Sequence, residues 1–367
     1  MGITKRFGLT LLVGLSAVCV TLAVLVQTVR PDLLSLFVGG FFGSIRSAIV
    51  WLYAIGLALA VFAFLYVPRT WRTRTVIVVA SGAVAIVMGA LHAARFSRDF
   101  SISTVQYRSS DGIQLEASLY LPKRPRPHPA LVFVHGSAPV RRGAYEIFVE
   151  PLVRDGYAIL LADKRGVGGS GGNFERQDNT GPANIARMTS DVVAGVRFLA
   201  SHPAIARDRI GLIGASQAGW VAPLAAVADT SVKFMVMITA PTVSTREENV
   251  WSAMRGDHTG EASASLEEAE AVLDTLSSKG VDARVPLARL RIPALWLFGE
   301  VDNSIPTKKN IRVLDSLKAN GAPFSYRLYE KYGHGLVGRN GAVVPRLAPT
   351  FRRDILAWLD STVAVSR

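Results

Sequence analysis

The sequence predicts an α/β fold, with a mostly parallel sheet and helices on both faces, preceded by three transmembrane helices. Three observations lead to this prediction. From about residue 100 onward, short apolar runs alternate with amphipathic helical patterns, as in a parallel sheet covered on both faces. One of these runs leads into a Gly-x-Ser turn and then a helix. The first 94 residues instead hold three apolar stretches, each near the length of about 20 residues that crosses a bilayer.

Residues 1–94 are predicted to form a membrane domain. A shorter apolar segment, 33–45, is interpreted as interfacial or re-entrant. The first apolar stretch follows Lys5 and Arg6, as a secretory signal would. It is longer than the apolar core of a signal and no cleavage site follows promptly, so we interpret it as an uncleaved helix. The three predicted spans are 7–29, 47–67 and 75–94.

Basic residues in the loops set the predicted orientation. Lys5 and Arg6 fall on the same side of the membrane as the loop that contains Arg69, Arg72 and Arg74. The positive-inside rule places this side in the cytoplasm. Three crossings then put the rest of the chain on the extracytoplasmic side of an integral membrane protein. A fourth crossing within the short apolar segment would reverse this orientation.

The charge balance narrows the possible partners. The chain has 367 residues with 41 Lys and Arg against 28 Asp and Glu, a net charge of +13. Basic runs interleaved with aromatic residues are absent, which argues against nucleic acid as a partner. Anionic membrane lipids suit the excess charge better. No metal cluster, phosphate-binding loop or dinucleotide motif appears, so no cofactor is implied.

Residues 95–367 are predicted to form a single second domain. It opens with a hairpin whose strands, 103–108 and 113–120, flank Asp111-Gly112. Strands and helices alternate after a Pro-rich connector. The expected strands are 131–134, 157–162, 210–213, 234–238, 294–298 and 324–329, and the expected helices are 145–154, 185–201, 307–318 and 351–359.

Residues 241–290 interrupt this alternation. Ser265 and Glu268 match a capping box, which predicts the start of a helix. Apolar side chains then recur on one face of that helix. The insertion is either a cap over the site or a surface excursion of helices, and the pattern leaves both readings open. The apolar face comprises Leu266, Ala269, Leu273 and Leu276.

The stretch 210–220, I-G-L-I-G-A-S-Q-A-G-W, is the strongest functional signal. A strand, a sharp turn and a helix around Gly-x-Ser form the context of a nucleophile elbow, with Ser216 at its tip. The residues two before and two after the serine must be small, because strand and helix nearly touch there. Gly214 meets this need, and Ala218 stands where glycine is usual.

A serine nucleophile needs a base, and the base needs an orienting carboxylate. His334 follows the last predicted strand on a glycine-flanked loop and is the preferred base; His258, in the insertion, is the weaker candidate. Asp302 follows the strand 294–298 and is the preferred acid, with Glu300 as its rival. The chain order of serine, aspartate and histidine is that of α/β-hydrolase triads.

The reaction also needs N–H donors for the oxyanion of its tetrahedral intermediate. One is predicted to be the backbone N–H of Gln217, at the start of the helix after the nucleophile. The other is expected from the loop after the strand 131–134, at Ser137 or alternatively Ala138. His135, in the same loop, is interpreted as a structural hydrogen-bonding residue.

Five stretches together resemble the α/β-hydrolase superfamily, in its serine esterase and serine aminopeptidase-like branch. The resemblance covers residues from about 100 to the end and implies the α/β-hydrolase fold. It also implies that Ser216, Asp302 and His334 are nucleophile, charge partner and base. Ala218 and Ala138-Pro139 depart from the usual glycines. The stretches are V-H-G-S-A-P, D-K-R-G-V-G-G-S, I-G-A-S-Q-A-G-W, G-E-V-D-N-S-I-P and Y-G-H-G.

In this branch Asp163, Arg165 and Gly166 resemble a structural turn. The favoured function is a membrane-anchored serine hydrolase that cleaves a carboxylic ester, or an amide, through an acyl-enzyme. The alternatives are an acyltransferase that uses the same triad, and a non-catalytic membrane scaffold or sensor. A small-molecule or lipid-like ester is the expected substrate class, inferred from location alone.

Overall fold

The computed structural model describes residues 99–257, 259–338 and 346–363. In these residues an eight-stranded sheet has the order β1-β2-β4-β3-β5-β6-β7-β8, and β9 pairs separately with β10. The strands are β1 (Phe100–Arg108), β2 (Gln114–Pro122), β3 (His128–Val134), β4 (Ala158–Ala162), β5 (Ile205–Ala215), β6 (Val232–Ile238), β7 (Ala294–Gly299), β8 (Phe324–Tyr329), β9 (Val337–Gly338) and β10 (Arg346–Leu347).

The helices fill the connections between these strands. The α-helices are α5 (Glu146–Arg154), α6 (Pro182–Ser201), α7 (Ala218–Ala228), α8 (Thr245–Met254), α9 (Leu266–Thr275), α10 (Arg284–Leu287), α11 (Thr307–Ala319) and α12 (Phe351–Thr362), with 3₁₀ turns η2 (Arg142–Tyr145) and η3 (His334–Leu336).

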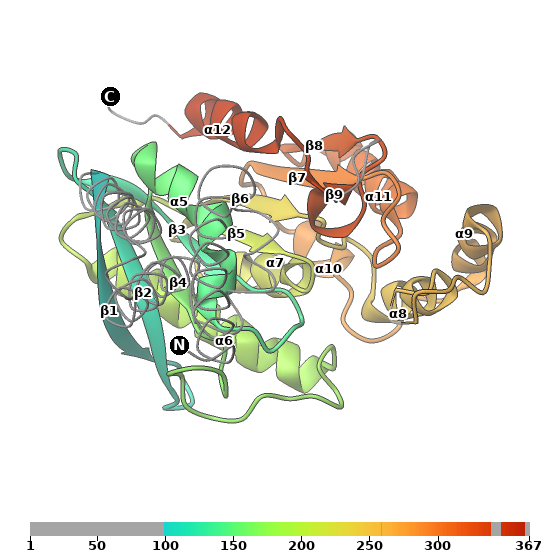
Figure 1. The fold of residues 1–367 in the computed structure, drawn as a ribbon, viewed down its shortest axis with the longest axis horizontal. Helices are drawn as coiled ribbons and strands as arrows, with labels where there is room; N and C mark the ends of the chain where they lie inside the picture. Colours follow the sequence, from blue (N-terminus) through green and yellow to red (C-terminus); the bar gives the residue numbers. More distant parts are fainter. Residues whose placement is uncertain (1–98, 258, 339–345, 364–367) are drawn as a thin grey trace, which may run out of the picture. The chain divides into compact units, whose positions relative to one another are not determined.

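The sheet is parallel except near one edge (Figure 1). β2 runs antiparallel to β4, whereas β4, β3, β5, β6, β7 and β8 are mutually parallel. The carboxyl ends of the parallel strands therefore meet at one edge of the sheet. In open α/β sheets this is the edge where ligands bind. This topology confirms the predicted α/β-hydrolase fold.

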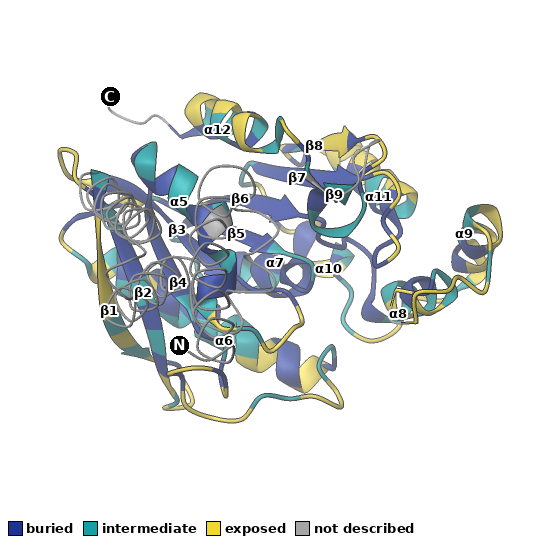
Figure 2. Ribbon diagram, in the orientation of Figure 1, coloured by how far each residue is buried: buried dark blue, intermediate teal, exposed yellow. Residues whose placement is uncertain are grey.

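Both faces of the central strands are buried (Figure 2). All seven residues of β3 and all six of β7 are buried, which explains why both strands are nearly continuous apolar runs in the sequence. Side chains from α6, α7, α10 and α11 share one hydrophobic cluster with alternate residues of the sheet. α12 packs on the opposite face, next to β7 (Figure 1).

Most predicted elements are present, and the start of β5 differs because exposed charged residues extend this strand. β5 begins at Ile205, five residues before the expected start, because the charged Arg207-Asp208-Arg209 segment continues the strand outside the apolar run. The predicted hairpin is present, with a 2.9 Å bond from Gly112 N to Ser109 O at its turn. Charged residues at one end of a strand carry no periodic apolar signal, so the pattern missed this extension.

The 241–290 insertion contains α8, α9 and α10. The predicted capping box is confirmed: Ser265 and Glu268 cap α9 reciprocally, and its predicted apolar face packs on Trp251. A second capping box, Ser244 with Glu247, starts α8, a helix that was not among the expected elements.

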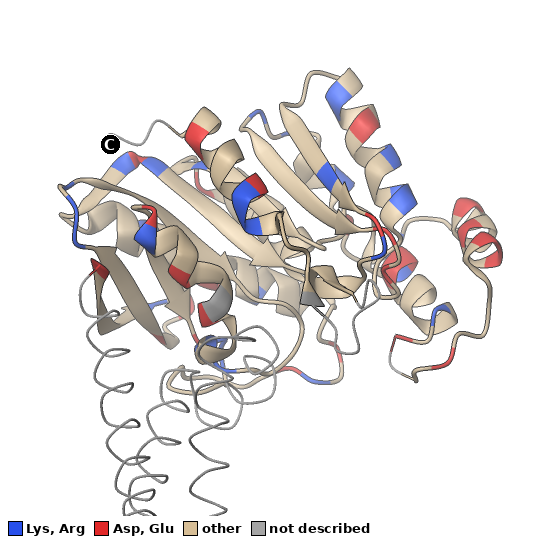
Figure 3. Ribbon diagram, turned by 45° about the horizontal axis from the view of Figure 1, so that its top comes forward, with Lys and Arg blue, Asp and Glu red and all other residues tan. Residues whose placement is uncertain are grey.

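Opposite charges connect the insertion to the sheet domain. α9 is acidic and α11 is basic, as Figure 3 shows. Lys308 lies 3.1 Å from Glu270, and Arg312 lies 2.8 Å from Asp274. Lys309 lies 3.1 Å from the buried Glu247 of α8. These pairs fix α8 and α9 beside the helix that follows the Asp302 turn.

The crossing of β5 and α7 is unusually close. A methyl group on Gly214 would lie 2.5 Å from Cβ of Ala218 and 2.8 Å from the carbonyl oxygen of Val134. Gly219 has a different role, because a Cβ there would collide with the backbone of Pro241. Ala218 is therefore the small residue that faces the strand, and Gly219 makes room for the chain after β6.

No helix among the described residues combines the length and apolarity needed to cross a bilayer. The predicted spans at 7–29, 47–67 and 75–94 lie outside the residues that the structure describes.

We expect Gly214→Ala to lower the free energy of unfolding by about 1–3 kcal/mol, the usual cost of overpacking a close contact. Ala218→Gly removes one side of that contact, so Gly214→Ala should cost less in an Ala218→Gly background. Denaturant unfolding of the two single variants and the double variant measures both effects. Equal costs in both backgrounds would contradict a clash between strand and helix.

Candidate active site

Ser216 stands at the tip of a strained turn between β5 and α7. Its φ is +53°, a left-handed conformation that a serine rarely adopts. The turn is fixed on both sides: Ser216 N donates to Ile238 O at 3.1 Å, and Gly219 N donates to Ser216 O at 2.9 Å. Ser216 remains partly exposed, whereas its neighbours Gln217 and Ala218 are buried. Strain at this position is the backbone signature of a nucleophile elbow.

Asp302 and His334 meet at the ends of β7 and β8. Nδ1 of His334 lies 2.9 Å from Oδ2 and 3.1 Å from Oδ1 of Asp302. Asp302 is almost fully buried, and its Oδ1 also accepts the N–H groups of Ser304 and Ile305. Those bonds leave the carboxylate fixed in one orientation. A histidine held this way presents its other ring nitrogen as a base.

Glu300, the rival acid, takes another partner. Its carboxylate accepts the backbone N–H of Lys331 at 3.0 Å and is exposed. The structure thus brings Asp302 to His334 and leaves Glu300 at the surface. His258, the second candidate base, lies outside the described residues.

The elbow and the histidine loop are connected through the end of β6. Ile238 O accepts the N–H of Ser216, and the next residue, Thr239, accepts the N–H of Gly335 through Oγ1 at 3.1 Å. Ser216 and His334 therefore flank the same strand end. Among the described residues no hydrogen bond joins their side chains. Such bonds are often long without substrate and tighten in the bound complex.

The charges around His334 favour its protonated form. Burial alone lowers the pKa of the imidazole, but Asp302, Asp257 and Glu248 outweigh it, so the pKa is raised above its ordinary value. The pKa of Glu248, on α8, is also raised, to about 8. Burial is the largest cause, and the charges of Asp257 and Asp302 add to it. α8 also approaches through Trp251, whose Nε1 donates to Asp302 O at 3.2 Å.

Gln217 lies at the amino-terminal end of α7, where helix N–H groups lack partners within the helix. Its backbone N–H has no acceptor in the described part of the chain. Its side chain is held on both sides: Oε1 accepts from Lys164 Nζ at 3.1 Å, and Nε2 donates to Asn179 O at 2.8 Å. Ser137 is exposed, and its carbonyl accepts from Asn179 Nδ2 at 2.9 Å.

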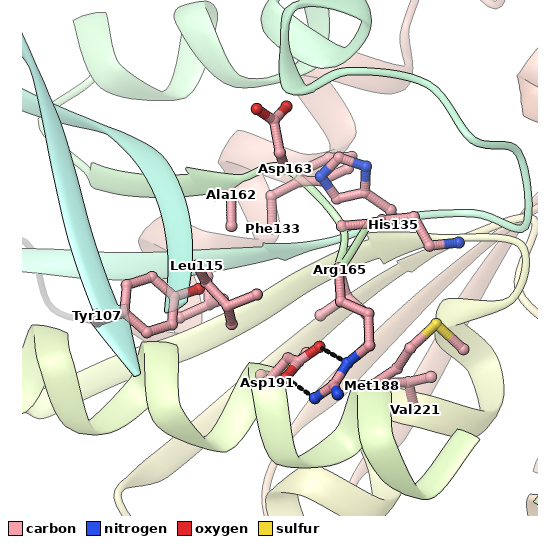
Figure 4. A pocket seen from close by; sticks show the side chains of 14 residues that line it. Tyr107, Leu115, Phe133, His135, Ala162, Asp163, Arg165, Met188, Asp191 and Val221 are labelled. Atoms are coloured by element: carbon pink, nitrogen blue, oxygen red, sulfur yellow. Dashed lines mark hydrogen bonds and ion pairs between the residues drawn. The ribbon is translucent and has the colours of Figure 1, made fainter. Parts of the chain in front are cut away.

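The Asp163–Gly166 turn has structural partners, as Figure 4 shows for Arg165. The Arg165 guanidinium forms two bonds to Asp191, at 2.9 and 2.6 Å, and two to Asp111, at 2.6 and 3.3 Å. Asp163 accepts from the N–H and guanidinium of Arg142. These ion pairs tie the turn to α6 and to the β1–β2 hairpin.

His135 is also unsuited to act as a base. It is buried at the end of β3 beside this turn (Figure 4). Burial, and then the charge of Lys164, lower the pKa of His135 to about 3. The ring therefore stays neutral at physiological pH, which agrees with a structural role.

The sequence reasoning missed Lys164, Asn179 and Glu248. Lys164 lies inside the D-K-R-G-V-G-G-S motif, but its contact with Gln217 arises only in the folded chain, because the two residues are far apart in the sequence. Asn179 lies in a loop without periodicity. Glu248 could have been placed on a helix from the sequence, because Ser244 and Glu247 form a capping box at the start of that helix.

Comparison with known proteins gives a family match. The model of the prolyl oligopeptidase family matches residues 146–365. An uncharacterized protein of Pseudomonas aeruginosa is 31% identical over 140 residues, which is 37% of this chain. The match spans 36% of that relative's length.

Solved structures with a similar fold include two esterases and a peptidase. The acetyl xylan esterase of Paenibacillus sp. R4 is 19% identical, with a TM-score of 0.52 over 72% of this chain and 85% of that one. An esterase of Pyrococcus furiosus is 17% identical, with a TM-score of 0.53 over 72% and 91%. The acylaminoacyl peptidase of Pyrococcus horikoshii is 16% identical, with a TM-score of 0.52 over 72% and 42%. At these identities the likeness shows a shared fold.

We expect Asp302→Asn to lower kcat by about 10²–10⁴-fold, because the histidine loses its orienting charge. The base must be neutral to act, so activity rises with pH through the pKa of His334. Removing a charge that raises this pKa should move the acid limb of kcat/KM to lower pH. pH–rate profiles of both forms test this prediction.

Glu300→Gln is the matched control, since it makes the same chemical change two residues away and keeps an acceptor for Lys331. It should leave both kcat and the acid limb unchanged. A large loss in Glu300→Gln, with little loss in Asp302→Asn, would reassign the acid.

Proposed function

This chain belongs to the prolyl oligopeptidase family, and we propose that it hydrolyses a carboxylic ester through an acyl-enzyme formed on Ser216. It is a serine hydrolase of the α/β-hydrolase fold. The observation that supports the proposal most is the strained Ser216 at the strand edge that also holds the His334–Asp302 pair. Each group has the chemistry that acyl transfer requires.

In the proposed reaction His334 takes the proton of Ser216 as Oγ attacks the carbonyl carbon. The carbonyl oxygen becomes an oxyanion, stabilised by the N–H groups of Gln217 and Ser137. Asp302 stabilises the imidazolium. The C–O bond to the leaving group then breaks, and His334 returns the proton to the departing alkoxide. Water, deprotonated by His334, attacks the acyl-enzyme, the bond between the acyl carbon and Oγ breaks, and His334 returns the proton to Ser216 as the acid is released.

The α8–α9 segment is proposed to act as the cap over this site. Trp251 contacts the Asp302 turn, and the carboxyl group of Glu248 is electrostatically coupled to His334. The ion pairs with α11 hold the segment in that position. A cap formed this way would determine which acyl or alcohol groups reach Ser216. The same triad would also cleave an amide, so a substrate panel should contain both matched ester and amide compounds.

Ser216→Ala should lower ester turnover by at least about a thousand-fold, because the other groups act only through the nucleophile. Turnover of a p-nitrophenyl ester series, with fluorophosphonate labelling of membranes that contain the full chain, measures the loss. Ser361→Ala, which removes an exposed hydroxyl on α12, is the control and should keep both signals. Turnover retained in Ser216→Ala would exclude the proposed mechanism.

We also propose that residues 1–94 anchor the enzyme in a membrane and that the hydrolase domain faces the extracytoplasmic side. The three apolar stretches and the loop arginines support this. The full chain should stay with membranes after alkaline carbonate washing. In sealed right-side-out vesicles, protease should degrade the hydrolase domain without detergent. Release by carbonate would contradict the anchor, and protection from protease would contradict the orientation.

A further inference from the structure

Lys164 connects the two loops that flank the nucleophile. It follows β4, and its ammonium donates to Gly136 O at 2.8 Å, to Ser137 O at 3.3 Å and to Gln217 Oε1 at 3.1 Å. The ammonium also lies 5.1 Å from the centre of the Phe174 ring. One side chain thus contacts the loop after β3 and the residue after Ser216, which are far apart in the sequence.

Lys164 forms no ion pair among the described residues, although the residue is partly buried. The nearby charged groups are engaged elsewhere: Asp163 by Arg142, and Arg165 by Asp111 and Asp191. Two other basic side chains lie near this contact: His135, which is neutral, and Arg176, whose guanidinium carbon lies 5.8 Å from the centre of the Phe174 ring. Burying an ammonium without a counter-ion is costly, so its retention calls for a functional explanation.

The geometry of the peptide group supplies that explanation. In a trans peptide the C=O of one residue and the N–H of the next point in opposite directions. Holding the carbonyl of Gly136 therefore directs the N–H of Ser137 away from Lys164. Holding the carbonyl of Ser137 does the same for the N–H of Ala138. These are the two N–H groups expected to serve as the second oxyanion donor.

We propose that Lys164 positions the oxyanion hole, by fixing the Gly136 and Ser137 peptide groups and the Gln217 side chain relative to Ser216. This rests on the proposed acyl-transfer function. Asn179 assists, because it donates to Ser137 O and accepts from Gln217 Nε2. The positive charge lies behind the carbonyls, so it polarises each peptide group toward a stronger N–H donor on the opposite side.

Replacing Lys164 with methionine, which keeps the length of the side chain, tests the proposal in the full-length protein. We expect kcat on p-nitrophenyl butyrate to fall by about 10–10³-fold, with little change in KM, since the lost interaction acts on the transition state. The rate at which a fluorophosphonate modifies Ser216 should fall in parallel. Lys164→Arg keeps charge and donors and should recover part of both rates. Lys233→Met, an exposed lysine of β6, should behave as wild type.

A pH profile separates positioning from mere structural support. Burial lowers the pKa of Lys164 to about 7. As the pH rises through that value, the ammonium loses a proton. The neutral amine then has two N–H donors for its three acceptors, which are the carbonyls of Gly136 and Ser137 and the side-chain oxygen of Gln217. Wild-type kcat should therefore decline on the alkaline side, and this decline should be absent in Lys164→Met. A melting temperature within a few degrees of wild type would show that the fold is intact.

The outcomes distinguish the two proposals. If wild type neither turns over the ester nor reacts with the fluorophosphonate, the proposed function fails. If wild type is active and depends on Ser216, but Lys164→Met keeps its kcat, only the role of Lys164 is overturned. If Lys164→Met does not fold, the pH profile of kcat for Lys164→Arg tests the proposal instead. A reduced kcat without the alkaline decline supports a positioning role for Lys164. A profile identical to that of wild type contradicts it.

Discussion

The close crossing of β5 and α7 is the constraint on which the candidate site depends. Gly214 and Ala218 leave so little space between strand and helix that the chain must reverse within three residues. At this reversal Ser216 adopts a φ of +53°. The reversal also places the N–H of Gln217 at the open end of a helix, where the helix dipole favours negative charge. One packing contact thus arranges both the proposed nucleophile and the proposed oxyanion donor.

The parallel sheet then gathers groups that are distant in the sequence. β6, β7 and β8 follow β5 in spatial order, so their carboxyl ends lie along one edge beside the elbow. Asp302 follows β7, and His334 follows β8. Two hydrogen bonds at the end of β6 hold the nucleophile loop and the histidine loop together: the backbone carbonyl of Ile238 accepts the N–H of Ser216, and the side-chain hydroxyl of Thr239 accepts the N–H of Gly335. The site is therefore built on strand ends, whose positions the core fixes.

The fold could be predicted from sequence because its signals are local. Apolar runs mark buried strands, Gly214 and Ala218 mark the elbow, and the Ser265–Glu268 pair marks a helix start. The sequence could not show whether Asp302 or Glu300 pairs with His334. The two carboxylates lie two residues apart in one loop, and the conformation of that loop decides which of them faces the histidine. Lys164 was missed for a similar reason: its partners are two carbonyls and an amide, which leave no trace in residue spacing.

Mass spectrometry of the fluorophosphonate adduct tests the central claim most directly, since it identifies the nucleophile without knowledge of the substrate. Trypsin releases Ser216 within residues 210–233, a peptide that also contains Ser231. Fragmentation should place a single phosphonyl group on Ser216, and the adduct should be absent from His334→Ala, in which the serine lacks its base. An adduct on Ser231 or any other residue, or undiminished modification of Ser216 without His334, would contradict the proposed triad.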